Sequence, residues 1–243
     1  MEITILGAIW IVLVHIILIG FLKINQKPSL LILKIICLYL ITYKSIEYGM
    51  NWIQGDFTKI PLEYSAISYF LFSITYLFNV KSLKPFVTFA AFFSGINYIL
   101  TFPFLGPQMV VDNGLISTLF SVANHGLLYL GSMIVMKNYV YTKESRKAIL
   151  IYTFFVITYT LMMPYLITLN NSHLFIYPLL DGRMLNSAFG TNVINGLVYI
   201  PYYIFLISCY WVIISLFYKI NSIIYRMHHD DVITTRTKER RQV

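Results

Sequence analysis

Long apolar stretches recur along almost the whole chain, and short polar links that carry most of the charge separate them. A helix needs about 20 apolar residues to cross the hydrocarbon core of a bilayer. Seven stretches approach this length, at residues 3–22, 29–48, 61–78, 85–102, 115–136, 148–169 and 192–218. We therefore predict an all-α polytopic membrane helix bundle with seven transmembrane helices over residues 1–220, followed by a basic cytoplasmic tail over residues 221–243.

Two links have an unusual composition. Pro103, Gly106 and Pro107 follow the fourth stretch, and we expect them to break its helix. Residues 170–191 form a long connection before the last stretch, and long connections in compact domains are often functional. In the last stretch, Pro201 predicts a kink.

The composition separates this chain from soluble proteins. Hydrophobic residues make up 58% of it and charged residues only 12%, with a mean hydropathy of +0.71, whereas charged residues are about 25% of a soluble domain. The net charge of +8 does not require a nucleic-acid partner, because most basic residues lie between the apolar stretches. Cys37 and Cys209 lie within predicted spans, so we expect no disulfide framework and no metal site or other cofactor.

The basic residues also predict how the chain is oriented in the membrane. Alternate links hold Lys23 and Lys27, then Lys81 and Lys84, then Lys137, Lys143, Arg146 and Lys147, and finally the Arg-rich tail. The remaining links hold only Lys59 and Arg183. Because cytoplasmic loops are enriched in Lys and Arg, we expect an external N-terminus and a cytoplasmic C-terminus.

Polar residues inside the apolar stretches are the candidates for function, because charges in a membrane are costly. Lys44 and Glu47 are three residues apart, so they share a helix face and can form an ion pair, with either a structural or a functional role. In the fourth stretch Ser94, Asn97 and Thr101 predict a polar stripe that faces the bundle. The full candidate set comes from four predicted helices and consists of Lys44, Glu47, Glu63, Ser65, Asn97, Asn124 and His125.

Ser65 and His125 suit nucleophilic chemistry on an acyl group. A serine is a weak nucleophile until a base takes its proton, and histidine is the usual base near neutral pH. Glu63 or Asn124 would orient these groups, and Lys44 would attract an anionic headgroup, with Glu47, Asn97 and Asn124 also binding substrate. An equally simple reading makes Ser65 a small residue that permits close helix packing.

Three short motifs carry a family resemblance. They are Pro61-Leu62-Glu63-Tyr64-Ser65, then Phe93-Ser94-Gly95 followed by Pro103, and then Phe120 with His125. Over the second to sixth apolar stretches, this pattern resembles the YwaF-type integral membrane proteins, bacterial proteins similar to an animal transmembrane acyltransferase family that builds polyunsaturated ether phospholipids.

The resemblance implies a role for two of these positions. The family pattern is Pro-Leu-His-x-Cys at the start of the third span and a His in the fifth, with the Cys and this His implied in acyl transfer. Pro61, Leu62 and His125 match that pattern, whereas Glu63 replaces its first His and Ser65 replaces its Cys.

Three hypotheses remain open from the sequence. The first is a lipid acyltransferase or acyl hydrolase of the bacterial plasma membrane that uses Ser65 and His125 in an outward-facing polar cavity and has a membrane lipid as its partner. The second is a non-enzymatic binding protein, either a small-solute carrier or an accessory subunit with a membrane-protein partner. The third gives the polar residues a purely structural role. The absence of an internal repeat in the sequence argues against a carrier.

Overall fold

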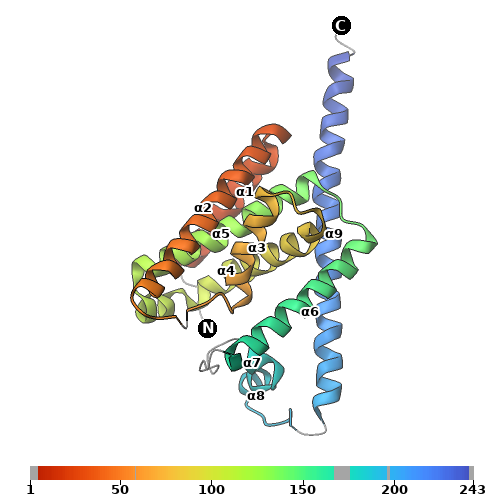
Figure 1. Ribbon diagram of the computed structural model, residues 1–243. Coiled ribbons are helices and arrows are strands. Elements are labelled where there is room, and N and C mark those ends of the chain that lie inside the picture. The colour runs from red at the N-terminus through yellow and green to blue at the C-terminus, as the bar shows by residue number, and fades with distance from the viewer. Residues whose placement is uncertain (1–4, 58, 167–175, 196–197, 241–243) are drawn as a thin grey trace.

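The computed structural model describes residues 5–57, 59–166, 176–195 and 198–240, and the described chain is helical without any β-strand (Figure 1). The elements are α1 (Ile5–Lys23), α2 (Gln26–Ile53), α3 (Tyr64–Leu77), the short 3-10 helix η1 (Lys81–Leu83), α4 (Lys84–Asn113), α5 (Leu115–Asn138), α6 (Lys143–Leu166), α7 (Ile176–Leu180), α8 (Arg183–Phe189) and α9 (Tyr199–Arg240).

Five apolar segments of the described chain are long enough to cross a membrane. They are Gln26–Ile53, Lys81–Asn113, Leu115–Asn138, Lys143–Pro164 and Tyr199–His228. The apolar parts of α1 and α3, Ile9–Gly20 and Tyr64–Leu77, are shorter. The predicted all-α class is confirmed and the chain has the helices of a membrane protein, whereas a count of seven spans stays a prediction.

The predicted break after the fourth stretch is wrong. Helix α4 continues through Pro103 and Pro107 to Asn113. A proline removes one main-chain hydrogen bond, and membrane helices tolerate this loss when their surroundings satisfy the freed group. The helix ends instead at Gly114, whose φ of +79° and ψ of 156° suit glycine alone, and α5 begins at the next residue.

Other predicted boundaries also shift, and the largest change is in α9, which runs from Tyr199 to Arg240 and so includes residues 221–240 of the predicted tail. Helix α3 begins at Tyr64 rather than at residue 61, because Glu63 has an extended backbone. Residues 176–189 of the long connection contain α7 and α8, while residues 167–175 lie outside the described chain. Pro201 lies in the first turn of α9, where a proline does not kink a helix, so the predicted kink is wrong.

Helices α1 to α5 form a bundle, and α6 and α9 cross one side of it, with α7 and α8 near one end of α6 (Figure 1). Large side chains such as Leu40, Phe72, Phe89 and Leu128 are fully buried between the bundle helices. Other apolar side chains point outward from α1, α2, α6 and α9, for example Ile207 at 68% exposure. Lipid contact explains such outward apolar faces, because lipid chains cover them without exposing them to water.

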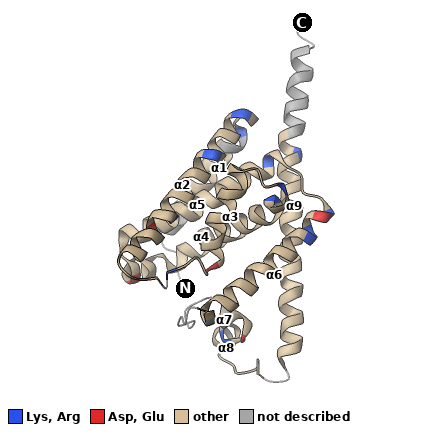
Figure 2. Ribbon diagram, viewed as in Figure 1, with Lys and Arg blue, Asp and Glu red and all other residues tan. Residues whose placement is uncertain are grey.

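Charges are divided between the two ends of the helices (Figure 2). Most of the described Lys and Arg residues lie at the end where α1 joins α2 and α5 joins α6, which we call the basic end. Most of the described Asp and Glu residues lie at the opposite end, which we call the acidic end, near the start of α3 and the end of α4.

Buried polar contacts hold the basic end together. The fully buried Asn221 of α9 accepts a hydrogen bond from the Tyr141 amide at 3.0 Å. Its side chain also donates to the carbonyls of Met136 and Tyr139, at 3.1 and 2.8 Å. Asn221 thereby connects α9 to the link between α5 and α6. Its own polar side-chain atoms are all hydrogen-bonded.

Candidate functional site

His125 of α5 lies where three helices of the bundle meet. Its ring stacks on Tyr98 of α4, with ring centroids 4.1 Å apart and planes within 7° of parallel. The Tyr69 ring of α3 meets it edge-on at 5.6 Å. On the third side, His125 Nδ1 and Ser94 Oγ are 3.4 Å apart, within hydrogen-bond distance. These contacts fix the plane of the imidazole, so His125 has a defined orientation.

A glycine allows this close approach of α4 and α5. A Cβ atom added to Gly95 would lie 2.8 Å from the His125 carbonyl oxygen and 2.7 Å from Tyr129 Cβ. Real Cβ atoms do not approach backbone atoms so closely, so only glycine fits. The motif Phe93-Ser94-Gly95 thus supplies both the partner of His125 Nδ1 and the space for α5.

Lys44 and Glu47 form the ion pair that their spacing predicts. Lys44 Nζ and Glu47 Oε2 are 2.7 Å apart, with the side chains 15% and 44% exposed respectively. Lys44 Nζ also lies 5.0 Å from the centroid of the Tyr69 ring, the same ring that contacts His125. A cation over an aromatic face is attracted by its electrons, so Tyr69 connects the ion pair to the histidine.

Asn124, next to His125, faces α2. The residue is 1% exposed, and its side chain interacts with the Tyr43 hydroxyl. Its Oδ1 atom has no hydrogen-bond partner among the described residues. Tyr43 stacks on Phe120 with ring centroids 5.4 Å apart, so the motif residue Phe120 positions Tyr43 rather than His125.

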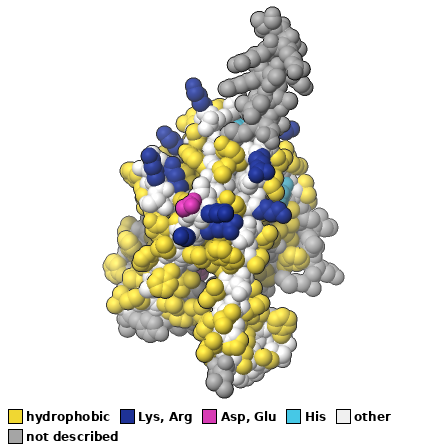
Figure 3. Space-filling view, turned by 90° about the vertical axis from the view of Figure 1, so that its right-hand side faces the viewer, with side chains coloured by type: hydrophobic (Ala, Val, Ile, Leu, Met, Phe, Trp, Pro, Cys, Tyr) yellow, Lys and Arg dark blue, Asp and Glu magenta, His cyan; other side chains and the backbone are white. Residues whose placement is uncertain are grey.

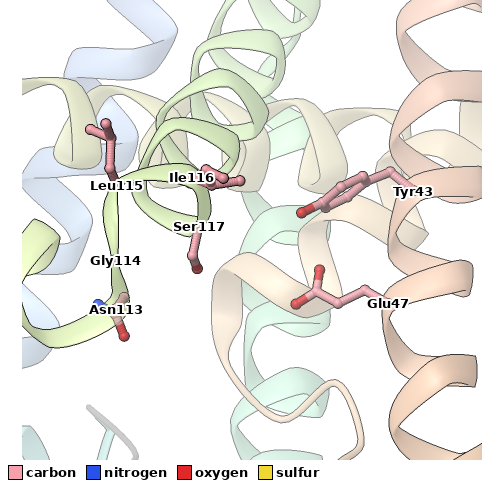
Figure 4. A pocket seen from close by; sticks show the side chains of 7 residues that line it. All are labelled: Tyr43, Glu47, Asn113, Gly114, Leu115, Ile116 and Ser117. Atoms are coloured by element: carbon pink, nitrogen blue, oxygen red, sulfur yellow. The ribbon is translucent and has the colours of Figure 1, made fainter.

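An open cavity of about 750 Å³ lies at the acidic end between α2 and the α4–α5 junction. Tyr43 and Glu47 line it on one side, and residues 113–117 line the other. Figure 4 shows the Tyr43 hydroxyl and the Glu47 carboxylate pointing from α2 toward Ser117 in the first turn of α5. A molecule that enters this open cavity from the surface could therefore contact a carboxylate and two hydroxyl groups.

Within the described chain, Ser65 is not among the hydrogen-bond or ring partners of His125, which are Ser94, Tyr98 and Tyr69. The Ser65 side chain is half-buried near the start of α3, and no hydrogen bond joins it to His125 within the described chain. Ser65 and Tyr69 are four residues apart, so they share a face of α3 and are separated by about 6 Å along its axis. Ser65 thus lies one helical turn beyond the ring that contacts His125, and its catalytic role stays a prediction.

Glu63 and Asn97 lie on the surface of the bundle. Glu63 is the exposed residue immediately before α3, and its side chain does not cap the helix. Asn97 is exposed on α4, and Thr101, also exposed, donates a hydrogen bond to the Asn97 carbonyl at 2.9 Å. The predicted inward stripe is therefore wrong for Asn97 and Thr101 and correct for Ser94, which is buried.

The aromatic partners of His125 were missed in the sequence. The only available signals were spacings of four, from Ser94 to Tyr98 and from Ser65 to Tyr69, which place each pair on one helix face. With 20 Tyr and 18 Phe in the chain, such spacings do not single out two rings. Tertiary structure was needed to recognise them.

Among the residues that the structure describes, no three His, Cys, Asp or Glu side chains are grouped so that they could hold a metal ion. Cys37 is buried in the core and Cys209 is half-buried on α9, and both are free thiols.

No protein-family model matches this chain, and it has no significant match among curated proteins or solved structures. The resemblance to YwaF-type proteins thus stays a prediction from short motifs, and function has to be argued from the site.

Proposed function

We propose that this chain is a seven-span membrane protein that binds a membrane phospholipid near the acidic end of its bundle and transfers or hydrolyses an acyl chain, with His125 as the general base. The observation that carries the proposal is the fixed imidazole of His125, held by Ser94, Tyr98 and Tyr69. A general base needs a defined orientation toward the proton that it removes.

Ser94 defines which nitrogen of His125 acts. If Nδ1–H donates to Ser94 Oγ, the lone pair lies on Nε2, for which the described chain provides no hydrogen-bond partner. Nε2 then takes the proton of the nucleophilic hydroxyl. Ser94 is thus a positioning residue, the role predicted from the sequence for Glu63 or Asn124.

Ser65 is the nucleophile in this proposal. Its Oγ attacks the ester carbonyl, forms an acyl-serine and releases a lysophospholipid, whose oxygen receives the proton from Nε2. A water molecule or an acceptor hydroxyl then takes the acyl group and restores Ser65. Ser65 is half-buried in the first turn of α3, so it is accessible to an ester near the membrane surface.

Lys44 and the outward faces of the bundle supply substrate binding. Lys44 lies next to Tyr69 and attracts a headgroup phosphate. Exposed apolar side chains on α2 and α5, such as Ile46 and Leu119, face lipid and leave the acyl chains in the bilayer.

The orientation belongs to the same proposal. The separation of basic and acidic ends supports an external N-terminus and a cytoplasmic basic end in a bacterial plasma membrane. In a cysteine-free background, a membrane-impermeant thiol reagent applied to intact cells should label Gln54→Cys but not Lys143→Cys. The reverse labelling would contradict the orientation.

The test of activity uses the purified full chain in lipid nanodiscs with phospholipids that carry an isotope-labelled acyl chain. Mass spectrometry should detect labelled fatty acid or a new acyl product, together with lysophospholipid. His125→Ala and Ser65→Ala should abolish both products. Ser94→Ala should lower kcat with little change in KM, because it alters only the orientation of the base.

Ser73→Ala is the matched control, since Ser73 is a fully buried serine of α3 whose hydroxyl has no partner among the described residues. It should retain activity. The proposal fails if the wild-type chain turns over neither zwitterionic nor anionic phospholipids, or if Ser65→Ala and His125→Ala both match the wild type.

One observation favours a second candidate, a non-enzymatic protein that binds a small polar solute. The cavity of about 750 Å³ is lined by Glu47 and Tyr43, and neither Ser65 nor His125 contributes to it. A solute that raises the unfolding temperature of the wild type and of Ser65→Ala, but not of Glu47→Gln, would support this candidate. Stabilisation that survives in Glu47→Gln would contradict it.

A further inference from the structure

Arg146, near the start of α6, is held at the basic end by two aromatic side chains of α9. Its guanidinium carbon lies 4.5 Å from the centroid of the Tyr218 ring and 5.9 Å from that of Trp211. Its Nε atom is buried without a hydrogen-bond partner among the described residues. No carboxylate within the described chain forms an ion pair with it. Arg146 is therefore fixed in place, and no carboxylate among the described residues neutralises its charge.

The surroundings of Arg146 are strongly basic. Lys143 and Lys147 are exposed on α6, and Lys219 and Arg226 are exposed on α9. Figure 3 shows the Lys and Arg side chains gathered on this face, with few acidic side chains among them. Glu144, an acidic residue of the same turn, interacts with Thr142 and the neighbouring lysines rather than with Arg146.

Apolar surface continues from this basic patch along α9. Trp211, which contacts Arg146, is 45% exposed, and Ile207 and Ile204, one and two turns away on the same face of α9, are 68% and 61% exposed. About two turns from Arg146 on α6, the hydroxyl of Thr153 forms a hydrogen bond with that of Tyr210, which links α6 to α9. An anionic headgroup at Arg146 would therefore have its acyl chains directly over apolar side chains.

We propose that Arg146, with the lysines beside it, binds the phosphate of an anionic phospholipid where α6 contacts α9. A planar guanidinium forms two parallel hydrogen bonds to phosphate oxygens, and basic pockets between membrane helices bind anionic headgroups. A soluble anion would use the charges but not the apolar surface. The site lies at the opposite end of the helices from the cavity and is independent of the proposed catalysis.

Trp211 provides the signal for a test, because its ring contacts Arg146. The full chain is studied with Trp10→Phe and Trp52→Phe, which leaves Trp211 as the one tryptophan of the three in the sequence. Trp10 Nε1 has no hydrogen-bond partner in the described chain, and Trp52→Phe removes only an exposed hydrogen bond to the Lys59 carbonyl, so both changes are mild. The probes are phosphatidylglycerol and phosphatidylcholine that carry bromine near the glycerol end of one chain.

Brominated phosphatidylglycerol should quench Trp211 at about a fivefold lower mole fraction than brominated phosphatidylcholine, and Arg146→Gln should remove this preference. Arg146→Lys should retain only part of it, because lysine lacks the planar pair of donors. Arg183→Gln is the matched control, since Arg183 pairs with Asp181 at 2.6 Å at the acidic end. It should leave the preference unchanged.

Equal quenching by the two lipids, or a preference that survives Arg146→Gln, would overturn the proposal. Loss of quenching on addition of inorganic phosphate alone, without any preference between lipids, would also overturn it and indicate a soluble anion. Native mass spectrometry of the chain with all tryptophans intact gives a second measurement. It should show phosphatidylglycerol retained by the wild type and by Arg183→Gln, but not by Arg146→Gln.

Discussion

The backbone of His125 lies against Gly95, at a distance that leaves no room for a Cβ atom between α4 and α5. An alanine Cβ at position 95 would be 2.8 Å from the His125 carbonyl oxygen. Gly95→Ala should therefore separate the helices and displace the imidazole from Ser94. Overpacking of this kind typically destabilises a protein by about 1–3 kcal/mol. Unfolding of the purified chain in detergent measures this cost.

Gly49→Ala is the matched control, because nothing lies within 4 Å of a Cβ atom at Gly49 in α2. It should leave stability unchanged or raise it by about 0.5–1 kcal/mol, since alanine favours a helix more than glycine does. Equal stability of Gly95→Ala and Gly49→Ala would contradict the packing argument.

Gly114 should be similarly intolerant of a side chain, for a different reason. Its φ of +79° and ψ of 156° lie in a region that only glycine adopts readily, and it is the single residue between α4 and α5. Gly114→Ala should cost about 1–3 kcal/mol through backbone strain. Thermal unfolding compared with Asn113→Ala, at an exposed neighbour, checks this. A smaller loss in Gly114→Ala than in Asn113→Ala would exclude strain at the junction.

The features that could be predicted from the sequence depend only on residues close to one another in the same helix. Apolar length was sufficient to recognise the five long spans, and a spacing of three was sufficient for the ion pair of Lys44 and Glu47. Both are properties of a single helix and follow from its rise and periodicity.

The surroundings of His125 depend instead on tertiary packing. Tyr69, Ser94 and Tyr98 come from two other helices, and the approach of Ser94 and Tyr98 on α4 to His125 depends on Gly95. Tertiary packing also explains why the predicted helix break at Pro103 is wrong. Proline disfavours a helix locally, but the sequence does not show that the surrounding helices allow α4 to continue through it. The sequence therefore indicated His125 and the ion pair of Lys44 and Glu47, but not the aromatic side chains that contact them.

Asn221 should be one of the most sensitive positions at the basic end. Its side chain satisfies the Tyr141 amide and the carbonyls of Met136 and Tyr139, and all of these groups would lose their partner in Asn221→Leu. Each buried unsatisfied group costs about 1–3 kcal/mol, so the loss should exceed that of any single hydrogen bond. Denaturant unfolding should show it, whereas Asn97→Ala, at an exposed amide, should have little effect. Similar stabilities of the two variants would contradict this role.

Tyr141 should make the stability of the chain depend on alkaline pH. It lies between α5 and α6, outside the membrane-spanning segments, and its hydroxyl donates to Thr88 Oγ1 at 2.7 Å. Burial raises the pKa of Tyr141 to about 12, although the hydrogen bond with Thr88 acts in the opposite direction. In the unfolded chain the pKa is about 10, so the folded state favours the neutral hydroxyl. This contribution is complete below pH 10 and is lost as the pH rises toward 12.

Comparison with Tyr141→Phe isolates this effect, because phenylalanine has no proton to lose. At pH 8 the wild type should be more stable by about 0.5–1.5 kcal/mol, the net contribution of a hydrogen bond. At pH 11 the advantage should fall by about 1.4 kcal/mol, because one pKa unit of difference has then been lost. Unfolding of both proteins in the same detergent at the two pH values gives the difference directly. A constant difference between them would show that Tyr141 does not titrate differently in the folded and unfolded states.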